Sequence, residues 1–258
     1  MYVVCTRCCG HRGWGSTPHS PTMKSLVLSL FPGADLFGMA FEIEGFCIVK
    51  GPDVLFGGDI RRFSPPPGRF DGIIGGPPCK VFSDAVEEQV ANTVNLIPEF
   101  TRVVRDAQPK WWVKENVVGA FDPELPDVKK ITFDAWDVGA NQRRVRCFWS
   151  NLTLEIVKNT TRTRDPWPTV LATEYKYSPG SKDRRRAGRK VGRRMTIEEV
   201  NEAMGLPRNF ATPALNTPMQ YEVRGNGVPL PMGRAVAKAV KKAISEGEKC
   251  PVSEQICS

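Results

Sequence analysis

Short apolar runs that end in glycine or proline turns are the feature that most limits how this chain can fold. Four such runs have the length of a buried strand: residues 25–31, 46–49, 71–74 and 111–113. Apolar residues at helical spacing follow the first run, through Phe37 and Phe41, and precede the last one, from Val90 to Val104. Strands that alternate with helices predict an α/β fold with a mostly parallel, twisted sheet.

Length and charge narrow the class of protein further. With 258 residues the chain can form one large α/β domain with a small appendage, and 36 Lys and Arg against 28 Asp and Glu favour a polyanionic partner. No long apolar span or signal peptide is present, and eight irregularly spaced cysteines are typical of reduced thiols. We therefore expect a cytoplasmic protein with no membrane contact.

The first 22 residues differ from the rest of the chain. Cys5, Cys8, Cys9 and His11 have the spacing of metal ligands, but the second ligand pair that a zinc site needs at domain-scale spacing is missing. We expect residues 1–22 to be a disordered extension, and we predict no metal site.

The stretch from Asp71 to Ser83 offers a candidate nucleophile. Pro77 and Pro78 restrict the backbone directly before Cys79, so its thiol would stand on a stiff support at the end of a strand. A buried cysteine in an ordinary turn is the alternative. If strands 71–74 and 111–114 are parallel neighbours, Cys79 and Glu115 emerge at the same sheet edge, unless Glu115 is simply a surface carboxylate.

Two later segments carry positive charge. Alternation from Arg144 to Phe148 predicts a strand that presents Arg144 and Arg146 on one face, or else an exposed basic edge strand. Between Lys158 and Arg194 stand twelve Lys or Arg and three acidic residues, with Trp167, Tyr175 and Tyr177 among them. This mixture suits phosphates and bases together, although a solvated loop would have a similar charge run.

The C-terminal part returns to regular structure. Thr196 and Glu199 form a capping box that predicts a helix through Met204. The last element is expected to begin at the Gly225 block and to continue as an amphipathic helix to Ile244. The predicted organisation is a core at residues 23–150, a basic segment at 151–193, a C-terminal part at 194–246 and a tail at 247–258.

Taken in order, these motifs resemble those of the DNA (cytosine-5)-methyltransferases in a compact, phage-like form. The resemblance rests on seven blocks in the family's order: Phe31-Pro32-Gly33, Gly58-Asp59-Ile60, Pro77-Pro78-Cys79, Glu115-Asn116-Val117, Gln142-Arg143-Arg144-Val145-Arg146, Arg194-Met195-Thr196 and Gly225-Asn226-Gly227-Val228. It implies a Rossmann-like class I methyltransferase fold in which residues 151–193 form a short target-recognition segment. It also implies a monomer that acts on double-stranded DNA in a bacterial or phage-infected cell.

The resemblance assigns a role to each block. Cys79 would add to carbon 6 of cytosine, Glu115 would bind or protonate N3, and Arg146 with Arg144 would hold the O2 carbonyl. S-adenosylmethionine would be held by Phe31, Pro32, Gly33, Ala34, Asp53, Asp59, Ile60, Pro77, Asn226 and Val228. DNA would be contacted by Lys80, Ser83, Thr169, Arg184, Arg185 and Arg186.

The chain also departs from the family pattern. An acid is usual where Ser29 stands, a glycine pair where Asp35 and Leu36 stand, and glutamine where Lys80 stands. Two alternatives therefore stay open, a methyltransferase for tRNA or other RNA and a non-catalytic DNA-binding protein. A restriction endonuclease partner is not identifiable from the sequence.

Overall fold

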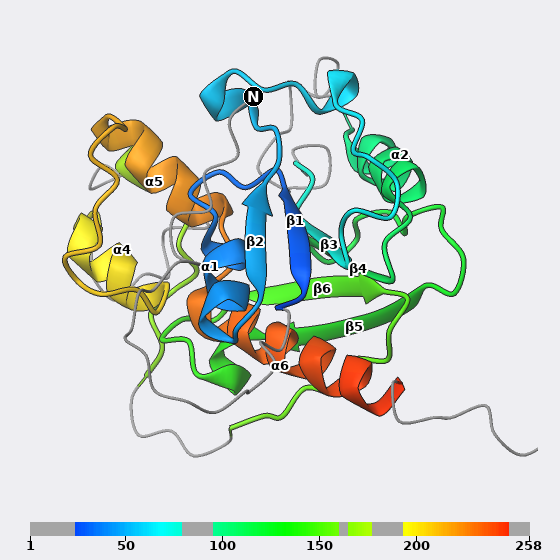
Figure 1. The fold of residues 1–258 in the computed structure, drawn as a ribbon. Coiled ribbons are helices and arrows are strands. Elements are labelled where there is room, and N and C mark those ends of the chain that lie inside the picture. The colour runs from blue at the N-terminus through cyan, green and yellow to red at the C-terminus, as the bar shows by residue number, and fades with distance from the viewer. Residues whose placement is uncertain (1–23, 79–94, 160–164, 177–192, 248–258) are drawn as a thin grey trace, which may run out of the picture.

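The computed structural model describes residues 24–78, 95–159, 165–176 and 193–247. These residues build one six-stranded sheet with the order β2-β1-β3-β4-β6-β5 and helices on both faces (Figure 1). The strands are β1 (Leu26–Leu30), β2 (Cys47–Lys50), β3 (Gly72–Gly75), β4 (Trp111–Asn116), β5 (Lys129–Asp134) and β6 (Val145–Ser150).

The sheet is mostly parallel, as the sequence predicts. β1 pairs in parallel with β2 and β3, and β3 pairs in parallel with β4. β6 runs antiparallel to both of its neighbours, β4 and β5. Because β6 is reversed, its first residues lie beside the last residues of β4, which brings two motifs that are distant in sequence to one edge.

Both faces of the sheet are covered by apolar packing. On one face, Phe37 and Phe41 of α1 (Leu36–Ile43) pack with Val236 and Val240 of α6 (Leu230–Gly247) over Trp111. On the other face, α2 (Ile97–Ala107) packs onto the alternate strand residues. The two-residue period of each strand therefore supplies both cores, and burial of these side chains is the main driving force for folding.

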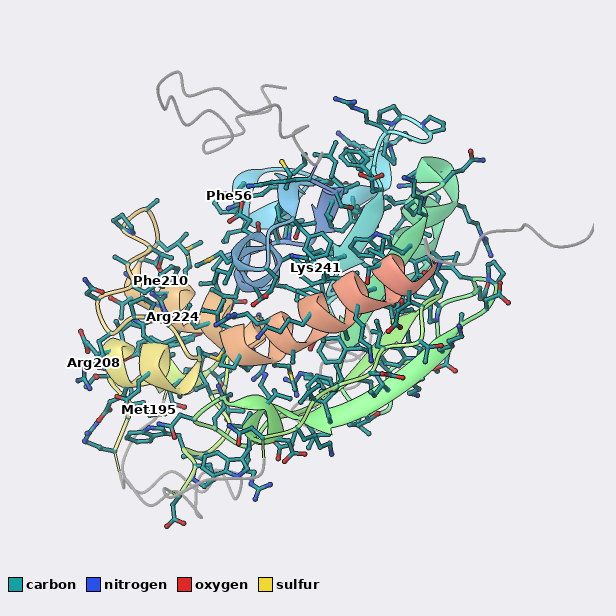
Figure 2. All side chains as sticks on the ribbon, turned by 60° about the horizontal axis from the view of Figure 1, so that its bottom comes forward. Phe56, Met195, Arg208, Phe210, Arg224 and Lys241 are labelled. Carbon is teal, nitrogen blue, oxygen red and sulfur yellow. The ribbon has the colours of Figure 1, made fainter. Side chains whose placement is uncertain are left out.

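A third apolar cluster joins the C-terminal part to the sheet. It packs α4 (Ile197–Ala203) and α5 (Thr217–Asn226) around Val170 and Leu36. The buried Arg224 donates to the Asn201 Oδ1 atom at 2.6 Å and to the Phe210 carbonyl at 3.1 Å. Figure 2 shows Arg224 and Phe210 close together in this lobe. The short 3₁₀ turns are η1 (Val54–Phe56), η2 (Ile60–Arg62), η5 (Ala135–Val138) and η6 (Glu174–Lys176).

Most predicted elements are confirmed, and one boundary is wrong. Thr196 and Glu199 form both hydrogen bonds of the capping box at the start of α4. The Gly225 block does not open the last helix, because Gly225 and Asn226 are the last residues of α5 and the final helix begins at Leu230. Of the helix predicted from Val90, the described part is α2.

Two expected absences can be compared only with the described ranges. There, no helix is long and apolar enough to cross a membrane, and no three His, Cys, Asp or Glu side chains group as a metal site would require. The cysteine-rich residues 1–22 and the tail from residue 248 lie outside those ranges.

Candidate active site

The carboxyl end of β1 is where this topology places a ligand. From β1 the chain continues to β2 on one side, and β3 lies on the other side, so the strand order reverses at β1. The turn that follows β1 contains three residues with positive φ: Phe31 at 55°, Gly33 at 53° and Asp35 at 57°. Two of them are not glycine, and such strain is typical of a functional turn.

Asp53 ties this turn to the loop that follows β2. Its Oδ2 atom accepts a hydrogen bond from the Gly33 amide at 2.8 Å, and its Oδ1 atom accepts one from the Leu55 amide at 2.8 Å. Space beside the Gly33 Cα is open, since a Cβ built there meets no atom within 4 Å. The structure thus brings together the predicted turn residues and Asp53, with room next to the turn.

The other predicted cofactor residues differ in burial and in their hydrogen-bond partners. Both carboxylate oxygens of Asp59 bind the Arg61 side chain at 2.9 Å, which lowers the pKa of Asp59, and Ile60 is buried in the core. Pro77 and Val228 are buried, whereas Asn226 is exposed at the end of α5. A Cβ at Gly227 would lie 2.8 Å from the Leu36 Cδ1 atom, so this block reaches the start of α1.

A buried ion pair stands at the carboxyl end of β4. Arg146 Nε lies 3.1 Å from Glu115 Oε1, and the two side chains are 16% and 9% exposed. Glu115 is paired in register with Phe148, so Arg146 lies two residues along on the same face. The burial of Glu115 excludes its reading as a surface carboxylate, and the place of β6 between β4 and β5 excludes its reading as an edge strand.

Burial is the main influence on the pKa of Glu115. Loss of hydration raises the pKa of Glu115, and the positive charges of Arg146 and Arg144 act in the opposite direction. A carboxyl group with a raised pKa holds a proton more readily than an exposed one. Glu115 is therefore suited to proton donation inside a closed site.

The loop that leaves β3 lies directly against this pair. Asn116 donates through its side-chain nitrogen to the Pro77 carbonyl at 3.1 Å. A Cβ at Gly76 would lie 3.0 Å from the Glu115 Oε2 atom, so the backbone passes close to the carboxylate. β3 and β4 are parallel neighbours, as the shared-edge argument for Cys79 and Glu115 requires. Cys79 itself lies outside the described residues, as do the DNA-contact candidates Lys80, Ser83, Arg184, Arg185 and Arg186.

Arg144 has contacts that differ from those expected for a base-binding residue. Its Nη1 atom donates to the Val170 carbonyl at 3.0 Å, and its Nη2 atom donates to the Gly225 carbonyl at 2.6 Å. Two terminal nitrogens are thus directed at backbone oxygens of the basic segment and of α5. The prediction that Arg144 holds the base beside Arg146 gains no contact from this arrangement and stays a prediction.

Gln142 is an anchor that the sequence reasoning missed. It is fully buried, donates to the Ala203 carbonyl at 2.9 Å and accepts from the Val170 amide at 3.1 Å. Thr169, a predicted DNA contact, is half-buried and donates through its hydroxyl to the Arg143 carbonyl. In the sequence, Gln142, Arg144 and Arg146 occupy alternate positions before and along β6. This alternation was the signal that the three side chains share one orientation.

A second missed residue is Lys114, which precedes Glu115 in β4. Its side chain is fully buried, its Nζ atom lies 3.7 Å from the centre of the Trp149 ring, and it donates to the Phe121 carbonyl. Burial lowers the pKa of Lys114 to about 8. A lysine within an apolar strand was the signal in the sequence. Lys114 fastens the loop that follows the Glu115 strand.

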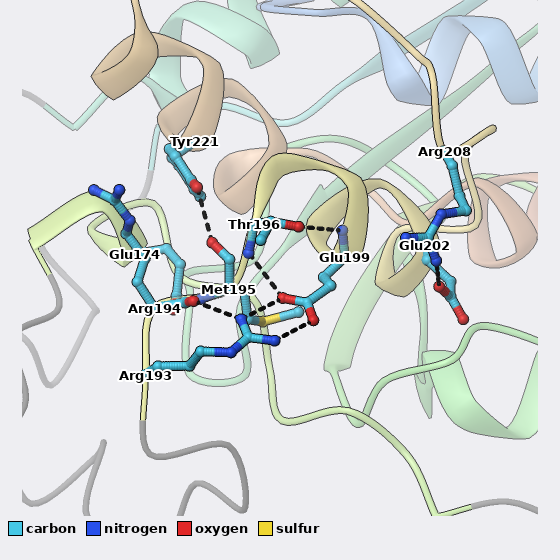
Figure 3. A network of polar contacts seen from close by, with 9 residues as sticks. All are labelled: Glu174, Arg193, Arg194, Met195, Thr196, Glu199, Glu202, Arg208 and Tyr221. Atoms are coloured by element: carbon cyan, nitrogen blue, oxygen red, sulfur yellow. Dashed lines mark hydrogen bonds and ion pairs between the residues drawn. The ribbon is translucent and has the colours of Figure 1, made fainter.

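Glu174 and Tyr175 of the basic segment contact residues 194–195 beside α4. The Glu174 carboxylate accepts a hydrogen bond from the Met195 amide at 3.3 Å, and Arg194 donates to the Tyr175 carbonyl at 3.4 Å. Arg193 forms hydrogen bonds of 2.6 and 2.8 Å with the capping residue Glu199 (Figure 3). Residues 174–175 and 193–195 are therefore held together at one place beside α4.

Comparison with solved structures identifies the fold class. An Entamoeba histolytica methyltransferase, EhMeth, superposes with a TM-score of 0.60 and 14% identity over 88% of this chain and 99% of that one. Spodoptera frugiperda DNMT2 gives a TM-score of 0.57 and 14% identity over 86% of this chain and 100% of that one. The protein thus has a Rossmann-like methyltransferase fold.

Sequence comparison identifies the family. The family model described as C-5 cytosine-specific DNA methylase matches residues 56–156 and 154–242, which is more than half of the chain, so the chain belongs to this family. It is 24% identical to the type II methyltransferase M.NgoPII of Neisseria gonorrhoeae over 84% of this chain and 96% of that protein. M.FnuDI of Fusobacterium nucleatum is 30% identical over 58% of this chain and 53% of its own length.

Proposed function

We propose that the protein transfers a methyl group from S-adenosylmethionine to carbon 5 of a flipped-out cytosine in double-stranded DNA. One observation carries the proposal: the Glu115–Arg146 pair lies against Gly76, and the neighbouring Asn116 binds the Pro77 carbonyl, so that both contact the backbone that leads into Cys79. The family to which the chain belongs supports the same reaction. The names of the type II relatives support a place in restriction and modification.

Each residue at this edge has a defined task in the proposal. The Cys79 thiolate adds to carbon 6 of the base, which breaks the ring conjugation and makes carbon 5 nucleophilic. Glu115 donates a proton to N3 as negative charge develops there, and Arg146 donates to the O2 carbonyl. Carbon 5 would then take the methyl group, its proton would leave to water as the bond from carbon 6 to sulfur breaks, and N3 would return its proton to Glu115, so that the Cys79 thiolate and Glu115 are both regenerated. Arg144 positions the pocket by holding the carbonyls of Val170 and Gly225.

The carboxyl end of β1 fits the methyl donor. The Phe31–Asp35 turn is strained, braced by Asp53 and open at Gly33, and Gly227, the residue after α5, lies against Leu36 at the start of α1. Backbone amides at such a turn and at the start of a helix suit the carboxylate of a methionine moiety. S-adenosylmethionine held there supplies the methyl group.

DNA is the substrate that charge and chemistry favour. The basic segment, with Arg184, Arg185 and Arg186, and the loop residues Lys80 and Ser83 would bind phosphates and bases around the pocket. The target base must leave the helix before Cys79 can reach it, at a cost of about a few kcal/mol that these contacts offset. We expect a monomer to be sufficient, because all the proposed groups come from one chain.

A covalent trap tests the proposal. The protein is incubated with S-adenosylmethionine and a duplex that contains fluorocytosine, which blocks loss of the carbon 5 substituent and leaves the thiol attached to the base. We expect an adduct with the wild type and none with Cys79→Ser, while Cys47→Ser serves as a matched control that keeps the adduct. An adduct of undiminished yield with Cys79→Ser would disprove the role of Cys79.

A second measurement separates the alternatives. Transfer of a labelled methyl group is compared between duplex DNA and tRNA under the same conditions. Methylation of the duplex supports the proposal. Methylation of tRNA alone would make the protein an RNA enzyme, and salt-sensitive DNA binding without transfer to either substrate would make it a binding protein.

A further inference from the structure

Ser29 and Asp35, two positions at which the sequence departs from its family's pattern, are direct partners. Ser29 is the fourth residue of β1, and Asp35 is the last residue of the turn that follows this strand. Their side chains are each 2% exposed, and the Ser29 hydroxyl donates to the Asp35 Oδ1 atom at 2.8 Å. The pair therefore links the strand to the far end of the turn by a hydrogen bond that water does not reach.

The start of α1 is built around the Asp35 carboxylate. Asp35 has a φ of 57° and a ψ of 37°, and its Oδ1 atom also accepts a hydrogen bond from the Gly38 amide at 3.2 Å. A Cβ at Gly38 would lie 2.3 Å from that oxygen, so only glycine leaves room for the carboxylate. One oxygen thus caps the helix and holds the strand, and it keeps Asp35 in a backbone conformation that aspartate tolerates but does not favour.

A neutral side chain could occupy the same place at lower cost. Asparagine adopts the left-handed conformation as readily, and its oxygen can cap a helix. The charged groups that face Asp35 are Lys50 of β2, 3.7 Å from Oδ2, and Glu42 of α1, whose charge opposes ionisation. Burial raises the pKa of Asp35 to about 6, so this position carries a charge near neutral pH that its surroundings disfavour. Such a cost is typical of a group kept for function.

We propose that the ionised Ser29–Asp35 pair is the positioning device of the cofactor turn, and that cofactor affinity falls when Asp35 takes up a proton. Asp35 acts through the backbone of residues 31–35 and touches no cofactor. The inference rests on the proposed function, because it assigns S-adenosylmethionine to this turn.

Mechanistically, the charge strengthens both hydrogen bonds that Asp35 accepts. A carboxylate accepts from a hydroxyl and from an amide more strongly than a carboxylic acid or an amide group does. Protonation therefore loosens the Ser29 contact and the cap at Gly38 together. The turn, with its strained Phe31, then loses the end point that holds it.

Cofactor binding is the first test. The Kd of S-adenosylmethionine is measured by calorimetry at about pH 8 and about pH 5 for the wild type, Asp35→Asn, Asp35→Gly and Ser29→Ala. Asp35→Asn should bind roughly tenfold more weakly than the wild type at the higher pH and change little with pH, as loss of one charge-assisted hydrogen bond predicts. Asp35→Gly, which loses the cap as well, should bind more weakly still.

A matched control and a double variant make this test specific. Asp106→Asn on the exposed side of α2 makes the same chemical change elsewhere and should leave the Kd unchanged. Ser29→Ala and Asp35→Asn together should cost less than the sum of the single changes if the two residues act as one unit. Equal affinity of Asp35→Asn and the wild type at the higher pH would overturn the inference.

A readout without cofactor keeps the two proposals distinguishable. Hydrogen exchange of the amides at residues 33–38, corrected for the intrinsic pH dependence of exchange, is followed across about pH 5 to 8. Protection should be lower in Ser29→Ala and in Asp35→Gly than in the wild type, because each variant loses a hydrogen bond that holds the turn. Equal protection in the wild type and in both variants would overturn the inference. Failure of the wild type to bind S-adenosylmethionine would instead overturn the proposed function.

Discussion

The two ends of the candidate site are held in different ways. At the β1 end, residues are positioned by a turn in which Phe31, Gly33 and Asp35 have positive φ values and which single hydrogen bonds brace. At the β4 end, residues are positioned by regular strands, because the reversed strand β6 brings Arg146 beside Glu115 in a fixed register. A single substitution can change the conformation of a turn. The position of Arg146 beside Glu115 changes only if the strand register shifts, which would move every side chain of the strand.

Both ends contain a buried carboxyl group with a raised pKa. Asp35 has a neutral hydroxyl as its near partner, and the Lys50 ammonium lies 3.7 Å away. Glu115 has the Arg146 guanidinium at 3.1 Å. In our proposals the same physical perturbation serves two purposes, positioning at one end and proton transfer at the other, according to the partner that the fold supplies. The substitutions below test this difference between the two ends.

The largest effect is expected at the β4 end. Glu115→Gln keeps the shape of the side chain but removes the proton that the reaction needs. We expect the single-turnover rate to fall by about 10² to 10⁴, the usual contribution of general acid catalysis, with the Kd of S-adenosylmethionine unchanged. The exposed Glu124→Gln is the control. Equal losses in rate and cofactor affinity would argue that Glu115 supports the whole site rather than the reaction.

Arg144→Met tests whether this arginine positions the pocket or binds the base. The change leaves the Val170 and Gly225 carbonyls without their donors, which should lower the free energy of unfolding by roughly 2–4 kcal/mol. Urea unfolding measures the loss, and Arg143→Met, at an exposed neighbour, should have little effect. Unchanged stability with a large loss of rate would instead assign Arg144 to the base, beside Arg146.

Asp35→Asn should stabilise the protein near neutral pH. From about pH 4 to about pH 6 the folded state keeps a proton that the unfolded state has lost, so stability of the wild type falls as pH rises through this window. Above about pH 6 the buried charge of Asp35 lowers the free energy of unfolding of the wild type by roughly 3 kcal/mol. Asp35→Asn removes this cost, but the loss of charge-assisted hydrogen bonds in the variant offsets part of the gain. Unfolding by urea at several pH values should show a gain near neutrality that disappears at about pH 4.

The result at Asp35 has two clear outcomes. A variant that is more stable but binds cofactor less well would show that the charge is kept for function. A variant that is less stable at every pH would show that the carboxylate is a structural cap, and the contrast between the two ends of the site would then disappear.

The smallest net effect is expected for Lys114→Met. Between about pH 8 and about pH 10.5 the unfolded state binds a proton that the folded state has lost, so stability of the wild type should rise with pH in this window. The variant should lack this rise. Near neutral pH its net change should be only about 1 kcal/mol, because removing a buried charge offsets the lost bond to the Phe121 carbonyl.

The control for Lys114 is an exposed lysine of the same sheet. Lys129→Met should retain the wild-type rise in stability at high pH, measured by the urea midpoint at about pH 7 and about pH 10. The same slope in Lys114→Met and the wild type would mean that another group is responsible.

Local patterns determined the frame of this protein. Strand-length apolar runs gave β1, β3 and β4, and the capping box gave the start of α4, because the period of a strand and the chemistry of a helix end depend on neighbouring residues. The shared edge of β3 and β4 followed from their parallel orientation, because parallel neighbours end at the same edge of a sheet. Charge alternation also placed Arg146 and Phe148 on one face, as β6 confirms.

Which polar groups from different elements become partners was settled only by tertiary packing. Arg144 binds carbonyls that are 26 and 81 residues away, and α5 was not predicted because its polar sequence is stabilised by Arg224 and the lobe around it. Ser29 and Asp35 were two separate departures in the sequence, and only the return of the chain over β1 makes them a pair. Buried polar groups must find partners wherever packing brings them, and no local pattern encodes that distance.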